Sequence, residues 1–326
     1  MRAARMLMLG IAIAAGIAAT VTPGHAQTGQ NFPGKPVRVV AGAYGSPSDI
    51  LARVLGPKMS ESWGQPVVVE NRPGAAGMIA ATIVSKAAPD GYTLLLISAQ
   101  FSILAALQSN LPYDPLKDFA GVTQLGYSTS ALVVLPSLGV KTVQDFIAYA
   151  QARPGQILFS SGGAGSSTHI NGEKFRFAAG IKAVHVGFKG TPDALIEVLG
   201  GRVHYCIVGL AAELPFIRDG RLLALAVSTP ERSPLLPDVP AMVEVLPGFG
   251  RDGSHSLLAP AGTPRAVLNK ISREVARIFA LPEVKDRLQA MGFHLEPTTP
   301  EEHDRIVRAQ IATFSEVARL VGLKAR

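Results

Sequence analysis

The chain has 326 residues, of which 48% are hydrophobic and 17% charged, and its 31 Lys and Arg against 24 Asp and Glu give a formal net charge of +7. The basic residues are scattered with few aromatic residues among them, which argues against a nucleic-acid-binding protein. The length and the apolar content predict a large hydrophobic core divided between two domains. The single cysteine, Cys206, excludes an internal disulfide and stands in an apolar run, where we expect it to be buried.

The first 26 residues have the pattern of a targeting segment. Arg2 and Arg5 precede an apolar run, Met6–Ala19, and the small residues Gly24 and Ala26 precede a cleavage point. These are the three regions of a secretory signal peptide, and the apolar run is short for a membrane span. We predict cleavage after Ala26 and export to the periplasm, with an uncleaved membrane anchor as the alternative.

Short apolar runs alternate with stretches of helical periodicity along the rest of the chain. The predicted strands are Val37–Ala41, Val67–Val69, Tyr92–Ile97, Ala131–Leu135, Ile157–Phe159, Ala183–Val186, Tyr205–Val208 and Leu223–Val227. The predicted helices are Ile50–Met59, Thr142–Ala150, Ile170–Ala178, Asp193–Leu199 and Ala211–Arg218, followed by a helical tail without strands, Ala266–Ala280, Glu283–Met291 and Pro300–Val321. This alternation predicts an α/β fold with largely parallel sheets.

The segment "SSGGAGSSTH", Ser160–His169, stands between a predicted strand and a predicted helix. It therefore occupies the carboxyl end of a strand, where open α/β sheets bind ligands. Its glycines allow a ligand to approach the backbone, and Ser166–Thr168 place hydroxyl groups beside the free N–H groups of a helix N-terminus, which favours an anion. The motifs for dinucleotides, nucleotide phosphates and hydrolase nucleophiles are each incomplete. We predict that the loop holds a carboxylate or phosphate, with a plain turn as the alternative.

Two other loops have the same setting. "AGAYGSPSD" follows the first predicted strand, with Tyr44 available to wall a pocket and Gly45 and Ser46 bringing backbone and hydroxyl close to a ligand. A hydroxyl before proline also predicts that Ser46 caps the helix that follows. "GFKGTPD" offers Phe188 and Lys189, although a lysine in a turn is more often solvated.

The histidines give no metal-binding frame, since they form no i, i+4 pair and no cysteine cluster accompanies them. They include His169, His185, His204, His255, His294 and His303. We expect His169 to line the pocket or to cap its helix, and His185 to be a hydrogen-bonded core residue. Ser161 and Ser166 are the candidate nucleophiles of an alternative hydrolase, but no base is spaced to activate either.

Eight segments in a fixed order carry a resemblance to a known family. They are "FPGKPVRVV", "PVVVENRPGAAG", "AAPDGYTLLL", "LPYDPLKDF", "SSGGAGSSTH", "HVGFKGTPDALIEVLGGRV", "LAVSTPERSPLLPDVPAMVE" and "APAGTP". With these segments the chain resembles the tripartite tricarboxylate transporter solute receptors, often called the Bug family, over essentially its whole mature length. The resemblance implies a two-domain receptor of the type II periplasmic binding protein architecture, which closes on a small carboxylate in a cleft between its domains.

In that family the loop matching Ser160–His169 holds a carboxylate through backbone and hydroxyl groups, and the loop matching Gly42–Asp49 closes over the ligand from the other domain. The residues and the resemblance together predict these ligand contacts: Tyr44, Gly45, Ser46, Asp49, Ser98, Ser161, Gly162, Gly163, Ser166, Thr168, His169 and Phe188. Two departures concern the distal half of the ligand. The first loop, "AYGSPSD", is one residue shorter than usual, and "GSHSLLAP" lacks the family's tryptophan. Tyr44, Phe188 and His255 then favour a flat or aromatic acid.

We predict that the chain crosses twice between its domains, near Gly126 and near Thr229. One domain would comprise residues 27–125 and 230–326, and the other residues 126–229. The expected partners are a small organic acid (a di- or tricarboxylate or an aromatic acid) and the permease subunits of a tripartite transporter. We expect a monomer without catalytic activity, cofactor or metal. A periplasmic hydrolase, and a receptor that feeds a sensor protein, are the alternatives.

Overall fold

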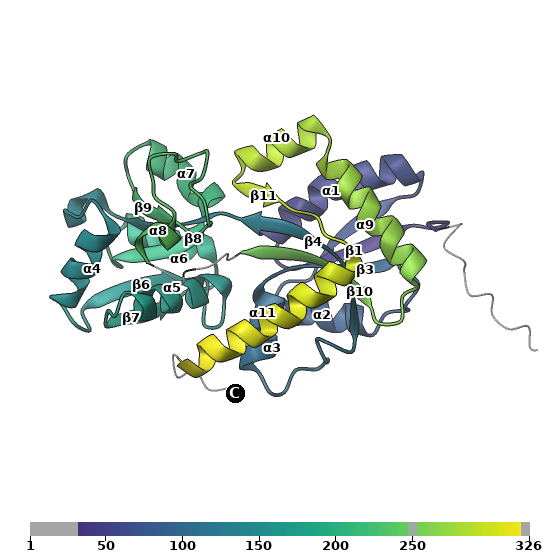
Figure 1. Ribbon diagram of the computed structural model, residues 1–326, viewed down its shortest axis with the longest axis horizontal. Helices are drawn as coiled ribbons and strands as arrows, with labels where there is room; N and C mark the ends of the chain where they lie inside the picture. The colour runs from purple at the N-terminus through teal and green to yellow at the C-terminus, as the bar shows by residue number, and fades with distance from the viewer. Residues whose placement is uncertain (1–31, 247–248, 250–252, 321–326) are drawn as a thin grey trace, which may run out of the picture.

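The computed structural model describes residues 32–246, 249 and 253–320, which form two lobes side by side (Figure 1). The predicted signal peptide and its cleavage point lie outside the described residues. Within the described part of the chain, no helix is long and apolar enough to cross a membrane.

The first lobe is built on a six-stranded sheet in the order β11-β4-β10-β3-β1-β2. Its strands are β1 (Val37–Ala41), β2 (Val67–Asn71), β3 (Thr93–Ser98), β4 (Phe119–Ser128), β10 (Ser254–Pro260) and β11 (Phe293–Leu295). One face is covered by α1 (Pro47–Trp63), α9 (Arg265–Phe279) and α10 (Pro282–Ala290). The other face is covered by α2 (Met78–Ser85), α3 (Gln100–Leu107) and α11 (Pro300–Leu320).

The second lobe is built on a five-stranded sheet in the order β7-β6-β8-β5-β9. Its strands are β5 (Ser130–Val134), β6 (Ile157–Ser161), β7 (Ala183–Gly187), β8 (Tyr205–Gly209) and β9 (Leu223–Val227). One face is covered by α4 (Val143–Gln151), α5 (Ser167–Ala178) and α8 (Met242–Val245). The other face is covered by α6 (Thr191–Leu199) and α7 (Leu210–Arg218). The two-domain α/β fold is thus the predicted one.

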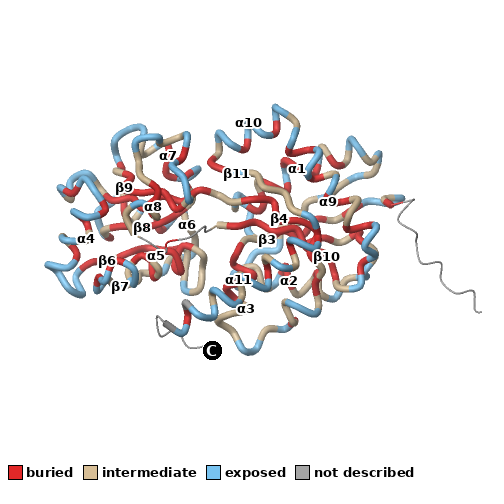
Figure 2. The backbone as a smooth tube through the Cα atoms, viewed as in Figure 1, coloured by how far each residue is buried: buried red, intermediate tan, exposed pale blue. Residues whose placement is uncertain are grey.

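Both sheets are sandwiched between helices, so their central strands are buried on both sides, as the red strands in Figure 2 show. This explains why the strands read as continuous apolar runs. The covering helices are amphipathic instead. In α9 the buried side chains of Val267, Ile271, Val275 and Ile278 recur every three or four residues and face the sheet. Burying each such side chain stabilises the fold by roughly 1.5–3 kcal/mol.

The prediction of largely parallel sheets was wrong, because both sheets are mixed. β1 pairs in parallel with β2 and β3, and β6 with β7 and β8. In contrast, β4 pairs antiparallel with β10 and β11, and β10 pairs antiparallel with β3. β5 also runs antiparallel to β8 and β9. The predicted strands did not include β4, β10 and β11, and β11 interrupts the tail that was expected to be helical. β4 carries Gly121, Thr123, Gln124 and Gly126, which hide its strand pattern.

The chain passes between the lobes where β4 continues into β5. It returns between Phe249, which is buried in the core of the second lobe, and Ser254, the first residue of β10. The predicted return was near Thr229. The segment 230–246 packs on the second lobe, because Ala241 bridges to a β9 residue and α8 buries its first side chain against that sheet. We therefore propose that the second domain extends to about residue 250.

Candidate ligand-binding site

Two strand-to-helix loops, one in each lobe, have the same backbone geometry. Ser46 ends the loop between β1 and α1 with φ −68° and ψ 158°, and Ser166 ends the loop between β6 and α5 with φ −68° and ψ 159°. Each serine is an N-cap, since its Oγ accepts from the backbone N–H three residues on, at 3.3 Å in α1 and 3.2 Å in α5. The cap predicted at Ser46 is therefore confirmed, and each lobe presents a helix N-terminus at the end of a strand, where anions are favoured.

The match extends to the glycine before each cap. Gly45 has φ +71° and its N–H donates to Oδ2 of Asp49 at 2.9 Å, while Gly165 has φ +77° and its N–H donates to Nδ1 of His169 at 3.0 Å. A positive φ favours glycine at both places. Asp49 and His169 thus occupy equivalent positions, where each side chain fastens its own loop.

The two loops open toward the same region between the lobes. β1 and β3 are parallel neighbours, so their carboxyl ends lie at one edge of the first sheet. Gln100 begins α3 directly after β3, and its side chain contacts Gly165 and Ser167 at the start of α5 in the other lobe. The loop of the second lobe therefore meets the edge of the first sheet on which the Ser46 loop stands.

Ser161 and Thr168 support the second-lobe loop from inside. Ser161 is fully buried, and its Oγ accepts from the N–H of Gly163 at 3.1 Å. Thr168 Oγ1 accepts from the N–H of Gly162 at 2.9 Å and lies 3.0 Å from Oγ of Ser166. Gly162, Gly163 and Ser166 are partly exposed. Of the predicted contacts on this loop, these three have surface open to solvent, while Ser161 and Thr168 hold the loop by hydrogen bonds.

Beneath the same loop, His169 and His185 stack with ring centroids 3.8 Å apart. Nε2 of His185 lies 2.6 Å from Oγ of Ser161, and His169 is 8% exposed. Burial, followed by the charge of His169, lowers the pKa of His185 to about 4, and burial also lowers the pKa of His169. Two neutral imidazoles therefore support the loop, and His169 fastens it.

In the first lobe, Asp49 is buried and accepts hydrogen bonds from other side chains. Its Oδ1 accepts from Nδ2 of Asn71 at 2.8 Å, and its Oδ2 accepts from Nε of Arg53 at 3.1 Å. Burial alone would raise the pKa of Asp49, but these bonds and that from Gly45 outweigh it and lower the pKa. Tyr44 is 80% exposed, and the Arg53 guanidinium lies 4.9 Å from the centre of its ring. Asp49 is therefore a buried support of the loop, and Tyr44 is open to solvent.

The remaining predicted positions lie around these loops. Ser98 ends β3 and its Oγ accepts from the N–H of Gln100 at 3.4 Å. Phe188 is partly exposed beside the second-lobe loop, where its N–H donates to the Ser161 carbonyl. His255 is 2% exposed, with its ring nitrogens 3.4 Å and 3.1 Å from the hydroxyls of Ser48 and Ser128, so its ring faces the interior.

Sequence reasoning missed Gln100 and Ser167. Gln100 stands two residues after a strand, like the residues that were singled out, but no glycine-rich motif marks its position. Ser167 was noted only for its hydroxyl group, whereas it is its backbone N–H that donates to the side chain of Gln100. Within residues 32–246, 249 and 253–320, no group of three or more His, Cys, Asp or Glu is placed to hold a metal ion.

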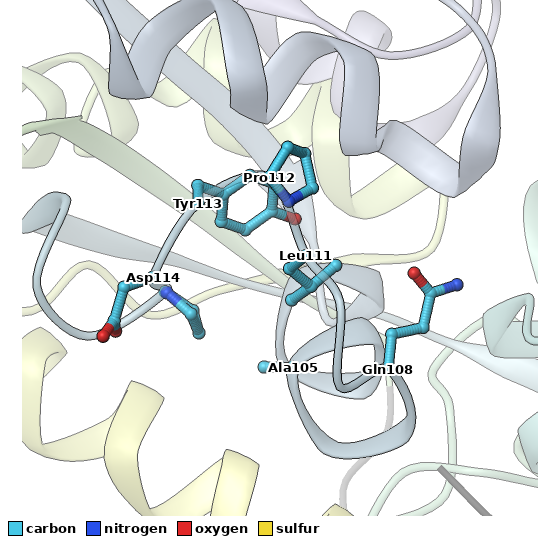
Figure 3. A pocket seen from close by; sticks show the side chains of 7 residues that line it. Ala105, Gln108, Leu111, Pro112, Tyr113 and Asp114 are labelled. Atoms are coloured by element: carbon cyan, nitrogen blue, oxygen red, sulfur yellow. The ribbon is translucent and has the colours of Figure 1, made fainter. Parts of the chain in front are cut away.

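A hollow of about 480 Å³ lies elsewhere on the first lobe, beyond the C-terminal end of α3 (Figure 3). It is lined by Ala105, Gln108, Leu111, Pro112, Tyr113, Asp114 and Pro115. The Tyr113 hydroxyl is buried and has no hydrogen-bond partner among the residues that the structure describes, and burial raises the pKa of this group to about 12. Its lining residue nearest to Gln100 in sequence, Ala105, stands five residues further along α3, a rise of about 7.5 Å, and none of the predicted ligand contacts lines the hollow.

Comparison with known proteins gives relatives over nearly the whole chain. Protein BugT of Bordetella pertussis (strain Tohama I) is 33% identical over 324 residues, which are 98% of this chain and 98% of that protein. The structure of R. palustris Rpa4515 with adipate is 31% identical, with a TM-score of 0.83 over 90% of this chain and 100% of that one. MatC (Rpa3494) from Rhodopseudomonas palustris with bound malate is also 31% identical, with a TM-score of 0.77 over 88% and 99%.

The family comparison covers both lobes. Residues 51–323 match the family described as "Tripartite tricarboxylate transporter family receptor". The matched span includes the second-lobe loop, α3 and the tail helices, and the similar structures share the two-lobed fold. The chain therefore belongs to the tripartite tricarboxylate transporter family of receptors, as its sequence motifs predicted.

Proposed function

We propose that this protein is a periplasmic receptor that captures a small organic carboxylate between its lobes and delivers it to a membrane permease. The observation that carries the proposal is the pair of serine-capped helix N-termini, α1 in one lobe and α5 in the other. Helix N-termini and hydroxyl groups stabilise an anion without a cation or metal. The proposed contacts are the partly exposed groups Gly162, Gly163 and Ser166, with Tyr44–Ser46 on the opposite side.

The ligand class has support from the similar structures, which hold adipate and malate. Both are aliphatic dicarboxylates, and each lobe of this chain offers one helix N-terminus. We therefore propose an aliphatic dicarboxylate with one carboxylate near Ser166. The aromatic acid favoured by Tyr44, Phe188 and His255 has less support, because His255 is buried and hydrogen-bonded to two serines.

For the hydrolase alternative, Ser161 and His185 are the candidate nucleophile and base, because their side chains are in hydrogen-bonding contact. Two features weigh against it. Ser161 is fully buried, and a histidine with a pKa of about 4 is a weak base. A panel of carboxylic esters tests this point, and turnover that disappears in a Ser166→Ala or Ser161→Ala protein would contradict the receptor proposal.

A thermal-shift screen of aliphatic dicarboxylates, tricarboxylates, aromatic acids and amino acids tests the ligand. At about a hundred times its dissociation constant, a ligand stabilises the folded protein by roughly 2.7 kcal/mol, which raises the melting temperature by a few degrees. Ser166→Leu should abolish the shift, because the bulky side chain fills the place of the carboxylate.

A matched control separates binding from stability. Thr142 is the N-cap of α4 in the same lobe, where its Oγ1 accepts from the N–H of Asp145 at 3.0 Å. Ser166→Ala and Thr142→Ala should each cost about 1 kcal/mol of stability, but Thr142→Ala should keep the full ligand shift. An uncharged best ligand, or parental affinity in the Ser166→Leu protein, would refute the carboxylate site.

A further inference from the structure

The carboxamide of Gln100 bridges the two lobes. Its Nε2 donates to the carbonyl oxygen of Gly165, and its Oε1 accepts from the N–H of Ser167 at 2.8 Å. Gln100 belongs to the first lobe, whereas both partners belong to the loop and first turn of α5 in the second. Gln100 as a whole residue is 8% exposed. Its donor and its acceptor are therefore both satisfied across the boundary between the lobes.

We propose that Gln100 is a latch that holds the lobes together and sets how readily the receptor closes. The proposal rests on the proposed function only in its consequence for ligand affinity. Both bonds exist only while the lobes are in contact, and when the lobes part, all four groups return to water. A net hydrogen bond shifts an equilibrium by about two- to tenfold, so the pair favours the closed form by roughly tenfold or more.

The latch stands on a well-anchored helix. Oγ of Ser102, two residues further along α3, donates to Oε1 of Gln310 in α11 at 3.1 Å, and Nε2 of Gln310 donates to Oγ of Ser254 at 3.0 Å. The N–H of Ala99 also donates to the Ser254 carbonyl at 2.8 Å. Ser254 is the first residue of the strand that returns from the second lobe. The start of α3 is thus hydrogen-bonded, directly and through Gln310, to the strand at which the chain re-enters the first lobe.

An alternative interpretation is that the Gln100 side chain occupies part of the ligand site. Its Oε1 accepts from the N–H of Ser167, the first residue of α5, and an anion would also bind to this N–H group. The bond to Gly165 favours the latch. Gly165 presents a carbonyl oxygen there, which an anion repels and which the Nε2–H of an amide satisfies. A carboxylate can accept from the N–H of Ser167 but has no hydrogen to donate to the carbonyl oxygen of Gly165, so it cannot replace both hydrogen bonds of Gln100. The two interpretations predict opposite effects of removing the side chain on affinity.

Small-angle X-ray scattering of the full mature chain without ligand tests the latch directly. Gln100→Met keeps the length and packing of the side chain and removes both hydrogen bonds, and Gln100→Ala removes the side chain. Gln108→Met at the other end of α3 is the matched control. We expect the parent and the Gln108→Met protein to have the same compact radius of gyration, and both Gln100 variants to be expanded. The melting temperature of the Gln100→Met protein verifies its fold.

A second arm measures affinity for the best carboxylate of the thermal-shift screen, which should weaken about tenfold in both Gln100 variants. Unchanged scattering in these variants, or a parent as expanded as they are, would overturn the latch, and tighter binding would favour the alternative interpretation. The scattering arm needs no ligand. If no carboxylate binds, the proposed function fails while the latch is still decided by scattering.

Discussion

At the scale of single residues, the carboxyl group of Glu213 is a costly group to bury. Glu213 lies in the first turn of α7 with 0% exposure, and neither carboxyl oxygen has a hydrogen-bond partner in the described structure. Burial raises the pKa of Glu213 well above 4.5. The backbone N–H groups of Val208 and Ala131 lower this pKa, but by less than burial raises it, and neither makes a hydrogen bond to the carboxyl group. The folded protein therefore keeps a proton that the unfolded chain loses above about pH 4.3, so this residue lowers stability as the pH rises.

Glu213→Met should therefore stabilise the protein at pH 8 by about 1–3 kcal/mol and by much less at pH 4, where the carboxyl is protonated in both states. Methionine has a similar length and adapts to irregular space. Urea unfolding at the two pH values measures the difference. Exposed Glu231→Met is the control and should change stability by less than about 0.5 kcal/mol. An equal gain at both pH values would mean that ionisation of Glu213 is irrelevant.

At the scale of elements, the junction between β4 and β11 depends on a close approach at Gly126. This residue has φ +126°, and a Cβ there would lie 2.0 Å from the carbonyl oxygen of His294 in β11. The obstacle is backbone, so the strands must move apart to admit a side chain. Gly126 stands two residues before the end of β4, where the chain leaves the first lobe, so this contact fixes the inter-lobe connection.

Gly126→Ala should cost at least about 2 kcal/mol, since it adds the contact with β11 to the cost of a positive φ, itself about 1–3 kcal/mol. Gly139→Ala is the matched control, because Gly139 has φ +77° and a Cβ added there would meet nothing within 4 Å. Denaturant unfolding of both proteins gives the difference. Equal losses of stability in the two proteins would show that the backbone of β11 does not lie close to Gly126 in solution.

At the scale of the whole molecule, three histidines whose pKa values are lowered in the fold should make the protein acid-sensitive. Burial lowers the pKa of His255 to about 4 and of His303 to about 3, and burial with the charge of His169 lowers that of His185 to about 4. All three are neutral in the fold, whereas the unfolded chain protonates them near pH 6.5. Stability is therefore present above pH 6.5 and is lost as the pH falls toward 4, by up to about 1.4 kcal/mol per pH unit for each histidine.

Melting temperatures between pH 7 and pH 4 measure this loss. His303→Gln should flatten the profile, because it removes one of the three titrating groups. Ser256→Ala is the control: it deletes the bond between Oγ of Ser256 and Nε2 of His303, 2.8 Å apart, and leaves the imidazole in place. This protein should be less stable and equally steep. A parent profile that stays flat down to pH 4 would contradict the neutral state of these histidines.

Local patterns in the sequence were enough to predict the fold class, the family and the position of the two strand-to-helix loops. The serine before a helix, the glycine with a positive φ and the apolar strand are local features, since a few neighbouring residues create them. Ser46 was therefore found as a helix cap, and Ser166 as a hydroxyl residue beside a helix N-terminus, whereas the capping role of Ser166 appeared only in the structure. β1, β6 and β9 were found for the same reason, because continuous apolar runs mark strands that are buried on both faces.

Which loop side chains are buried, and which contacts join the lobes, could be seen only in the folded molecule. Ser161, Thr168 and His169 stand in the same motif as Ser166 but point inward, and sequence does not state the direction of a loop side chain. β4, β10 and β11 become strands through antiparallel partners that are distant in the sequence, which outweigh their weak local pattern. Gln100 gains its role from a contact with Gly165 and Ser167, 65 or more residues away. Such contacts exist only once both lobes are folded and joined.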